Sequence, residues 1–295
     1  MSDDFRCGTV AIVGRPNVGK STLLNHLVGQ KVSITSNKAQ TTRHRITGIL
    51  TEADTQFLFL DTPGFQKSHE NALNRVLNRT VGQALSDADV GLFMVEALRY
   101  SDADEAVLRQ VSELKHVLLL VSKCDKVKEK GKLLAFLKEM QGKHSFAAIV
   151  PVSVKQKKSL DELKHVVRGY LPVAPPVFDA DNFTDRSERF MATEFIREKV
   201  FRQVGDELPY AVNVVIDKYE QVGNLRRIFA SIIVEKSSQK AILIGEKGDR
   251  LKRIGTDARK DMETTFGGKV YLELFVRVKK GWADDESLVR QYGYE

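Results

Sequence analysis

The stretch TVAIVGRPNVGKSTLL, from Thr9 to Leu24, decides the fold of this chain. It contains an apolar strand, a glycine-rich turn and the start of a helix. The turn GRPNVGKS matches the G-x-x-x-x-G-K-S/T pattern of a phosphate-binding loop, in the strand–turn–helix context that this pattern requires. Its glycines allow successive backbone N–H groups to point at phosphate oxygens beside the helix N-terminus. The stretch therefore predicts a nucleotide-binding domain, and a chance glycine-rich turn is the weaker alternative.

Short apolar runs alternate with helical patterns from this loop to Leu171. The alternation predicts an α/β domain whose mostly parallel sheet is covered by helices on both faces. The expected strands are residues 9–14, 46–51, 56–61, 90–95, 117–123 and 147–153, and the expected helices are residues 20–29, 74–85, 104–114, 132–140 and 160–171.

A proline-rich stretch, LPVAPPVFDADNFTD, separates this pattern from a different one. It holds three of the seven prolines and has no helical period, so it predicts a linker. After Ser187 the expected elements run helix, strand, strand, helix, helix, strand, which predicts a smaller α+β domain. The expected division is a first domain at 1–172, a linker at 173–186, a second domain at 187–283 and a C-terminal tail at 284–295.

The composition is that of a folded globular chain. Hydrophobic residues make up 42% and charged residues 29% of the 295 residues. The net charge of +7 favours a polyanionic partner without proving one. The two cysteines cannot build a disulfide framework or a structural zinc site, so a reducing cytoplasm is expected. The start, MSDDFRCG, does not read as a signal peptide, and no apolar run approaches the ~18 residues of a membrane span.

The motif DTPG, at the end of the strand QFLFL, indicates a magnesium–triphosphate site. Lys20 is expected to reach the β- and γ-phosphates, and the Ser21 hydroxyl is expected to ligate Mg²⁺. Asp61 is expected to hold Mg²⁺ through water, and the Gly64 N–H to sense the γ-phosphate. Turns of this kind are common, so the motif gains its meaning from its place shortly after a phosphate-binding loop.

The segments SKCD and PVSVK, each at the end of an apolar strand, predict a guanine pocket. The Asp125 carboxylate can accept hydrogen bonds from the ring N–H and the exocyclic amine of guanine. Adenine lacks this pair of donors, and a buried carboxylate without a partner is costly. The Lys123 stem can cover the base plane, while Ser153 and Lys155 can complete the pocket edge. A charged surface loop is the alternative.

A second glycine-rich turn, GEKG, lies between two helical segments in AILIGEKGDRLKRIG, residues 241–255. No strand is expected directly before it, so it does not suit a nucleotide phosphate. Residues 236–260 hold eight Lys or Arg against three acids, Glu246, Asp249 and Asp257. This local positive charge, and glycines that permit close approach of a sugar-phosphate backbone, predict an RNA contact. A plain helix connector is the alternative.

These motifs carry a resemblance to a known family. GRPNVGKS, QTTRHR, DTPGF, SKCD and SVK look like the G domain of translation-type GTPases. The order α-β-β-α-α-β with a helix–GxxG–helix turn looks like a type II KH domain. Together, over nearly the whole chain, they are similar to the Era family of bacterial ribosome-assembly GTPases, with a TrmE-Era-type G domain. The resemblance implies a P-loop GTPase domain with a mostly parallel sheet, followed by a smaller α+β type II KH domain.

The resemblance also implies roles for individual residues. It makes Thr42 the switch threonine over Mg²⁺, with the adjacent Thr41 as the alternative, and it seats K⁺ on Asn17. The implied GTP-binding residues are Gly14, Arg15, Pro16, Asn17, Val18, Gly19, Lys20, Ser21, Thr22, Asp61, Thr62, Pro63, Gly64, Phe65, Ser122, Lys123, Cys124, Asp125, Ser153, Val154 and Lys155. The implied catalytic or switch residues are Lys20, Asn17, Thr41, Thr42 and Gly64, and the implied metal ligands are Ser21, Thr42 and Asp61. The implied RNA-binding residues, in a loop that clamps about four nucleotides, are Ile244, Gly245, Glu246, Lys247, Gly248, Arg250, Leu251, Lys252, Arg253 and Ile254.

Two positions depart from what this class of GTPase leads us to expect. Ser122 stands where the family usually has Asn, and a hydroxyl is shorter and offers one donor. We therefore expect Asp125 to keep guanine selectivity at a lower affinity. Phe65 follows DTPG, where a Gln would orient the attacking water, and Gln66 is one position away. Slow hydrolysis is therefore expected.

The family implies hydrolysis of GTP to GDP and phosphate, and binding of the 3′ end of small-subunit ribosomal RNA while the small ribosomal subunit matures. A cytoplasmic monomer is expected, and peripheral contact with the inner face of the cell membrane is left open. Two alternatives also stay open. One is a GTPase of the tRNA-modification group, which shares TTR and DTPG but has catalytic-cysteine and folate-type domains. The other is an RNA-binding module with a degenerate nucleotide site.

Overall fold

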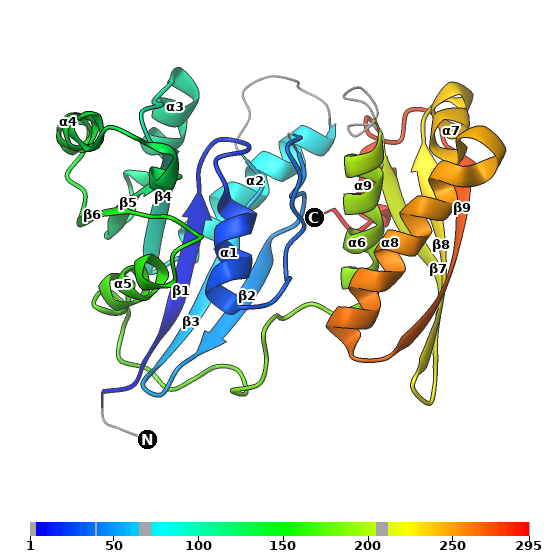
Figure 1. Cartoon of the computed structure of the whole chain (residues 1–295), viewed down its shortest axis with the longest axis horizontal. Helices are drawn as coiled ribbons and strands as arrows, with labels where there is room; N and C mark the ends of the chain where they lie inside the picture. Colours follow the sequence, from blue (N-terminus) through cyan, green and yellow to red (C-terminus); the bar gives the residue numbers. More distant parts are fainter. Residues whose placement is uncertain (1–3, 39, 65–71, 205–211, 295) are drawn as a thin grey trace. The chain divides into compact units, whose positions relative to one another are not determined.

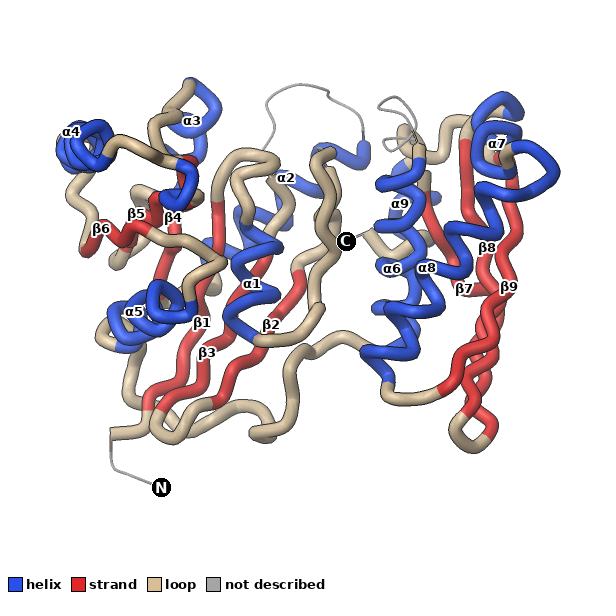
Figure 2. The backbone as a smooth tube through the Cα atoms, in the orientation of Figure 1, coloured by secondary structure: helices blue, strands red, loops and turns tan. Residues whose placement is uncertain are grey.

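A computed structural model of the chain describes all residues except 1–3, 39, 65–71, 205–211 and 295. The chain divides into two units, each of which has its own sheet (Figures 1 and 2). The first unit comprises Met1–Ser33, Thr42–His69 and Leu77–Asp185, and the second comprises Ile34–Thr41, Glu70–Val76 and Arg186–Glu295.

A six-stranded sheet in the order β2-β3-β1-β4-β5-β6 organises the first unit. β2 runs antiparallel to β3, and the other neighbouring pairs are parallel, so the expected mostly parallel sheet is confirmed. Every residue of β3 is buried, as expected for a strand covered on both faces. The strands are β1 (Arg6–Val13), β2 (Ile46–Thr51), β3 (Thr55–Asp61), β4 (Val90–Glu96), β5 (Val117–Ser122) and β6 (Ala148–Pro151).

Helices cover both faces of this sheet (Figure 1). Helices α1 and α5 pack into one hydrophobic cluster, and α2, α3 and α4 pack into the other. In α5, Leu160, Leu163 and Val167 are buried at helical spacing, while the other residues of the helix are half-buried or exposed. The helices are α1 (Lys20–Val28), α2 (Ala72–Ser86), α3 (Asp102–Val111), α4 (Lys130–Gln141) and α5 (Lys157–Arg168), with a short 3₁₀ turn η1 (Cys124–Lys126).

The second unit has the expected order α-β-β-α-α-β. In its sheet, β7 pairs antiparallel with β8, and β8 pairs parallel with β9. Its core joins apolar residues of all three strands to α6, α7 and α8. The elements are α6 (Glu188–Gln203), β7 (Asn213–Val222), β8 (Leu225–Val234), α7 (Ser237–Ile244), the 3₁₀ turn η3 (Glu246–Gly248), α8 (Asp249–Phe266) and β9 (Lys269–Val278).

The C-terminal tail contains a helix that the sequence analysis did not anticipate, α9 (Glu286–Gln291). Its start is fixed by Asp285, whose side chain accepts hydrogen bonds from two backbone N–H groups of the first turn. Just before it, Trp282 is fully buried and stacks on Tyr294. The signal that was available in the sequence is the capping aspartate directly before ESLVRQ.

Part of the predicted linker lies against the first unit. The Ala174 N–H donates to the Phe5 carbonyl at 3.1 Å. The buried Gln56 side chain accepts from the N–H groups of Val177 and Phe178 at 2.7 and 3.0 Å. These hydrogen bonds hold residues 174–178 in place, so this part of the predicted linker is not a free spacer.

We expect Phe195→Ala to destabilise the second unit by about 3–5 kcal/mol, because it removes a fully buried ring from the core. Trp282 is the single tryptophan and is buried in that unit, so its fluorescence during urea unfolding reports this transition. The matched control is Leu134→Ala, at a side chain that is 71% exposed. An unchanged midpoint for Phe195→Ala contradicts the assignment of the core.

Candidate functional site

The predicted phosphate loop lies between β1 and α1 and takes backbone conformations that few residues adopt. Asn17 has a φ of 64° and Gly19 a φ of 113°. At Gly14 the requirement is space, because a Cβ there would lie 2.6 Å from the carbonyl oxygen of Met94. Glycine is therefore demanded at Gly14 by packing and at Gly19 by backbone conformation.

The Lys20 ammonium is buried inside this loop. It donates to the carbonyl oxygens of Gly14 and Arg15 at 3.0 and 3.2 Å. Burial lowers the pKa of Lys20 to about 8, although the nearby Asp61 carboxylate acts in the opposite direction. The Lys20 ammonium is thus positioned inside the loop by two backbone carbonyls, and a bound phosphate group can replace these carbonyls as its partner.

Three hydroxyl groups gather on one oxygen of the Asp61 carboxylate. Ser21, Ser33 and Thr42 donate to Oδ2 at 2.6, 2.7 and 3.5 Å. The other oxygen, Oδ1, is buried and has no hydrogen-bond partner among the described residues. Burial raises the pKa of Asp61, against the effect of the Lys20 charge and of these hydroxyls. Carboxylate and hydroxyl oxygens suit Mg²⁺, and the orphaned Oδ1 is the atom that a hydrated cation would satisfy.

The structure distinguishes the two adjacent candidates for the switch threonine. The Thr42 hydroxyl lies 2.9 Å from the Ser21 hydroxyl. The Thr41 hydroxyl instead donates to the Lys38 carbonyl at 2.6 Å and lies 2.6 Å from the Ser36 hydroxyl. Thr42 therefore joins the predicted metal ligands, and Thr41 does not.

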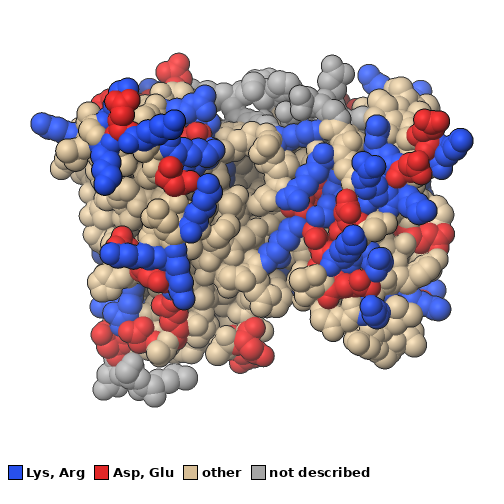
Figure 3. Space-filling view, in the orientation of Figure 1, with Lys and Arg blue, Asp and Glu red and all other residues tan. Residues whose placement is uncertain are grey.

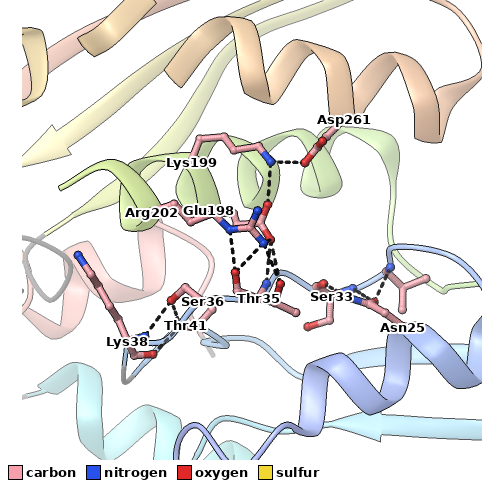
Figure 4. A network of polar contacts seen from close by, with 11 residues as sticks. Asn25, Ser33, Thr35, Ser36, Lys38, Thr41, Glu198, Lys199, Arg202 and Asp261 are labelled. Carbon is pink, nitrogen blue, oxygen red and sulfur yellow. Dashed lines mark hydrogen bonds and ion pairs between the residues drawn. The ribbon is translucent and has the colours of Figure 1, made fainter. Parts of the chain in front are cut away.

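The residues before Thr42 pack within the second unit. Ile34 is fully buried in its core. The Thr35 N–H donates to the buried Glu198 carboxylate of α6 at 2.9 Å, and the Arg202 guanidinium donates to the Thr35 carbonyl at 3.1 Å (Figure 4). The predicted switch segment is thus held by α6 side chains that no sequence motif singled out.

The DTPG motif lies close to the phosphate loop. The Thr62 hydroxyl donates to the carbonyl of Ile12 in β1 at 2.9 Å. A Cβ on Gly64 would lie 2.9 Å from three atoms of Pro16. Any side chain at this position would clash with Pro16 of the phosphate loop, so the position requires glycine. Phe65, on which the expectation of slow hydrolysis depends, lies outside the described residues.

The predicted guanine-binding residues come together around Asp125. Its Oδ1 accepts from the Ser153 hydroxyl at 3.0 Å, and its Oδ2 pairs with the Lys155 ammonium at 3.1 Å. The Lys155 hydrogen bond, with help from Ser153, lowers the pKa of Asp125, so the carboxylate is charged at neutral pH. Because the Lys155 side chain is 72% exposed, it can leave Oδ2 free to accept from guanine.

Ser122 ties the base-binding loop to the phosphate loop in spite of its short side chain. Its hydroxyl is buried and donates to the Val18 carbonyl at 3.2 Å. The Lys123 ammonium reaches the Asn17 carbonyl at 3.4 Å. Among the other predicted pocket residues, Thr22 of α1 and Cys124 of η1 are half-buried, Pro63 is buried, and Val154 packs on the core.

Glu96 is a site residue that the sequence analysis missed. It ends β4 opposite Ser122 and pairs with Arg15 at 3.2 Å and Lys123 at 2.9 Å. Burial works against its ionisation, but the Lys123 hydrogen bond and the two cations outweigh burial, so the pKa of Glu96 is lowered. Its signal in the sequence is a lone carboxylate that ends the apolar strand VGLFMVE.

The GEKG turn has the backbone that its glycines permit. Gly245 has φ 74° and ψ −177°, and a Cβ there would lie 2.8 Å from the Cβ of Arg250. Lys247 and Gly248 have φ values of 50° and 85°. A Cβ on Gly248 would meet no atom within 4 Å, so this glycine faces open space.

A groove runs from this turn along α8 and β9. Lys and Arg side chains gather around α7 and α8, with acids among them (Figure 3). Of the predicted contacts, Glu246, Lys247, Lys252 and Arg253 are exposed, and Ile244 and Arg250 are half-buried. The groove is lined by Gly248, Leu251, Lys252, Gly255, Thr256, Arg259, Leu272, Glu273 and Leu274.

One predicted RNA contact is wrong. Ile254 was expected to face the bases, but it is fully buried in the core of the second unit. Ile254 shares one face of α8 with Ala258 and Met262, which are also buried in this core, whereas Lys252, Thr256 and Arg259 lie on the face that lines the groove. An apolar residue on this helix can serve the core or the groove, and packing assigns Ile254 to the core.

The fold and site define a guanine-nucleotide-binding P-loop domain joined to a KH-type domain. Residues 9–123 match the model of the 50S ribosome-binding GTPase family, and residues 207–283 match that of the KH domain. The chain is 56% identical to the GTPase Era of Nitrosomonas eutropha, over 99% of this chain and 98% of that one. It is 52% identical to the GTPase Era of Neisseria meningitidis serogroup A, over 99% of this chain and 96% of that one. The chain belongs to the Era family, and the protein is a GTPase.

Solved structures of Era support the same family assignment. A complex of Era with MgGDPNP and nucleotides 1506–1542 of 16S ribosomal RNA has a TM-score of 0.94 at 39% identity, over 98% of this chain and 99% of that one. An Aquifex aeolicus Era variant bound to GDP·AlF4⁻ gives the same values. Neither the tRNA-modification alternative nor a degenerate nucleotide site fits this family and the assembled Lys20, Ser21 and Asp61. In the described part of the chain, no helix is both long and apolar enough to cross a membrane.

We expect Asp125→Asn to weaken GDP binding by at least about 100-fold, because two charge-assisted hydrogen bonds of about 1.5–3 kcal/mol each are lost. The same variant gains affinity for xanthosine diphosphate, whose carbonyl accepts from the new amide. Parallel titrations with the two nucleotides measure the exchange, and Asp161→Asn on α5 is the control. Equal GDP binding by Asp125→Asn and wild type shows that the pocket is misplaced.

The pKa of Lys20 makes GDP affinity depend on pH. With a pKa of about 8 in the free protein, Lys20 loses its proton as the pH rises, whereas a bound phosphate favours the charged form. We expect GDP affinity to fall about tenfold between pH 7 and pH 9. The affinity of guanosine, which lacks phosphate, serves as the control and changes little. A flat GDP profile rules out a buried Lys20 of lowered pKa.

Proposed function

We propose that this protein is a GTP-hydrolysing switch that binds the 3′ end of small-subunit ribosomal RNA through its second domain during assembly of the small ribosomal subunit. The observation that carries the proposal is the GxxG turn, which opens onto a groove between α8 and β9 in the same chain as the residues predicted to bind a guanine nucleotide. Single-stranded RNA is recognised by KH folds through such a turn. The related Era complex with 16S ribosomal RNA nucleotides supports the choice of RNA.

The nucleotide chemistry of the proposal rests on residues of the first unit. Mg²⁺ supplies positive charge at the phosphates, and Ser21, Thr42 and Asp61 would hold it. Lys20 holds the β- and γ-phosphates, and Asp125 selects guanine. We propose that Asn17, in its left-handed conformation within the loop, seats a K⁺ ion, and that hydrolysis is slow because no Gln follows DTPG.

The domain limits in this proposal are 1–172 for the GTPase domain, 173–186 for the connection, 187–283 for the KH domain and 284–295 for the tail. The protein would act as a cytoplasmic monomer on the small subunit. Contact with the inner face of the cell membrane would be peripheral. Both cysteines are free, which suits a reducing compartment.

Binding measurements test the proposal directly. GTP and ATP titrations are run with and without an RNA that ends in the small-subunit 3′ sequence, and a scrambled RNA of equal length is the control. We expect GTP to bind and ATP not to bind, and the matched RNA to bind more tightly than the scrambled one. Equal binding of the two RNAs contradicts recognition of the 3′ end.

We expect Gly248→Asp to abolish RNA binding and leave GDP binding unchanged. The new side chain enters the open space at the turn, its charge repels phosphates, and a φ of 85° strains any side chain. Filter binding at several salt concentrations, beside a GDP titration, measures both effects. Normal RNA binding by this variant would show that the turn only connects two helices and does not contact RNA.

Lys252→Ala is the comparison for that variant. Lys252 is exposed beside the groove, so its loss removes one phosphate contact without distorting the turn. We expect weaker RNA binding for every sequence and a salt dependence with a slope lower by about 1. A loss confined to one RNA sequence contradicts a phosphate contact.

A further inference from the structure

Ser33 contributes a buried hydroxyl to the proposed magnesium site, although it lies outside the P-loop, DTPG, SKCD and SVK motifs. Its Oγ is 2.7 Å from Asp61 Oδ2, and the residue is 1% exposed. We propose that Ser33 is a positioning residue for magnesium: its hydrogen bond to Oδ2 holds the Asp61 carboxylate in place beside the expected ligands Ser21 and Thr42. The proposal rests on the use of Mg²⁺ proposed above for the same site.

The three hydroxyls on Asp61 Oδ2 are expected to have different roles toward a bound cation. Ser21 and Thr42 are the expected ligands, so their oxygens would coordinate a bound cation. Ser33 is not among these expected ligands, so its hydroxyl would stay available for the hydrogen bond to Oδ2 when a cation is bound. With Oδ2 held and Oδ1 without a partner, the rotation of the carboxylate is fixed. Such outer hydrogen bonds orient metal ligands in proteins.

Asn25 of α1 in turn fixes Ser33. Its Nδ2 donates to the Ser33 carbonyl at 2.7 Å, and its Oδ1 accepts from the N–H groups of Val32 and Ser33 at 2.9 Å each. Figure 4 shows the Asn25 side chain facing the backbone of Ser33. Asn25 is four residues after Ser21, so one face of α1 presents both an expected metal ligand and the side chain that anchors Ser33.

The contacts act in series: Asn25 positions Ser33, Ser33 positions Asp61, and Asp61 would position the cation. The loop after α1 has no regular secondary structure of its own at Ser33. Its backbone polar groups are satisfied instead by the Asn25 amide, which makes three hydrogen bonds with one side chain. Replacing either residue should therefore weaken Mg²⁺ binding while leaving the phosphate and guanine contacts of the nucleotide in place.

The test uses the full-length protein loaded with a fluorescent GDP analogue, whose release is measured over a range of Mg²⁺ concentrations. We expect Ser33→Ala to need about tenfold more Mg²⁺ for half-maximal retention of the nucleotide. Its release rate in EDTA should equal that of wild type. Ser33→Thr keeps the hydroxyl and should restore most of the Mg²⁺ response.

Ser231→Ala is the matched control, because Ser231 is also buried and donates to an aspartate, Asp217, at 2.6 Å in the second unit. It should leave the Mg²⁺ response unchanged. Asn25→Ala should shift the Mg²⁺ midpoint in the same direction as Ser33→Ala. Adding Ser33→Ala to Asn25→Ala should cause less than the sum of the two shifts, because the two residues act in series.

A folded Ser33→Ala protein with the wild-type Mg²⁺ midpoint overturns the proposal. If Ser33→Ala does not fold, Asn25→Ala, which keeps the hydroxyl, decides: an unchanged midpoint overturns it. Fully additive shifts overturn the route through Asn25. A wild-type protein whose GDP release ignores Mg²⁺ removes the metal from the proposed function itself, which is a distinct result.

Discussion

The nucleotide site depends on the parallel pairing of β1 with β3. In this register Ile12 lies opposite Asp61, so the strand that leads into the phosphate loop and the strand that ends in the carboxylate predicted to hold magnesium finish at the same edge of the sheet. A slip of one residue would turn Asp61 to the opposite face, away from Ser21 and Thr42. Such a slip would also force the side chains of β3 to repack in the hydrophobic clusters on both faces of the sheet, which is costly in a close-packed interior.

The two glycine-rich turns show how similar sequences serve different chemistry. In the first turn, Gly14 is required by its distance to a β4 carbonyl, and a strand delivers the chain to the N-terminus of α1. In the second turn, Gly245 is required because its backbone conformation disfavours a side chain and because a Cβ would clash with Arg250. This turn follows a helix, α7, and not a strand. The first turn therefore surrounds phosphates, whereas the second opens onto a groove beside a helix.

Much of the fold could be predicted from local patterns. The mostly parallel sheet, the order of elements in the second unit, and the gathering of Asp125 with Ser153 and Lys155 follow from strand-end motifs at recognisable spacing. Other features lacked such a pattern. Glu96 is a single carboxylate without a motif, and Ile254 belongs to an amphipathic helix with apolar residues on more than one side. For Ile254, contact with α6 and the sheet decides which side is buried.

The sequence by itself predicted the phosphate loop and the KH-type turn, because each lies within a few consecutive residues whose backbone conformation is set locally. It predicted the guanine pocket from two short segments, each at the end of an apolar strand. Only the tertiary structure decided between Thr41 and Thr42, and only it brought Ser33 and Asn25 to Asp61. Two adjacent threonines are chemically identical in the sequence. Which hydroxyl faces Asp61 depends on the path of the chain from α1 to β2, and that path is fixed in part by hydrogen bonds to residues distant in the sequence.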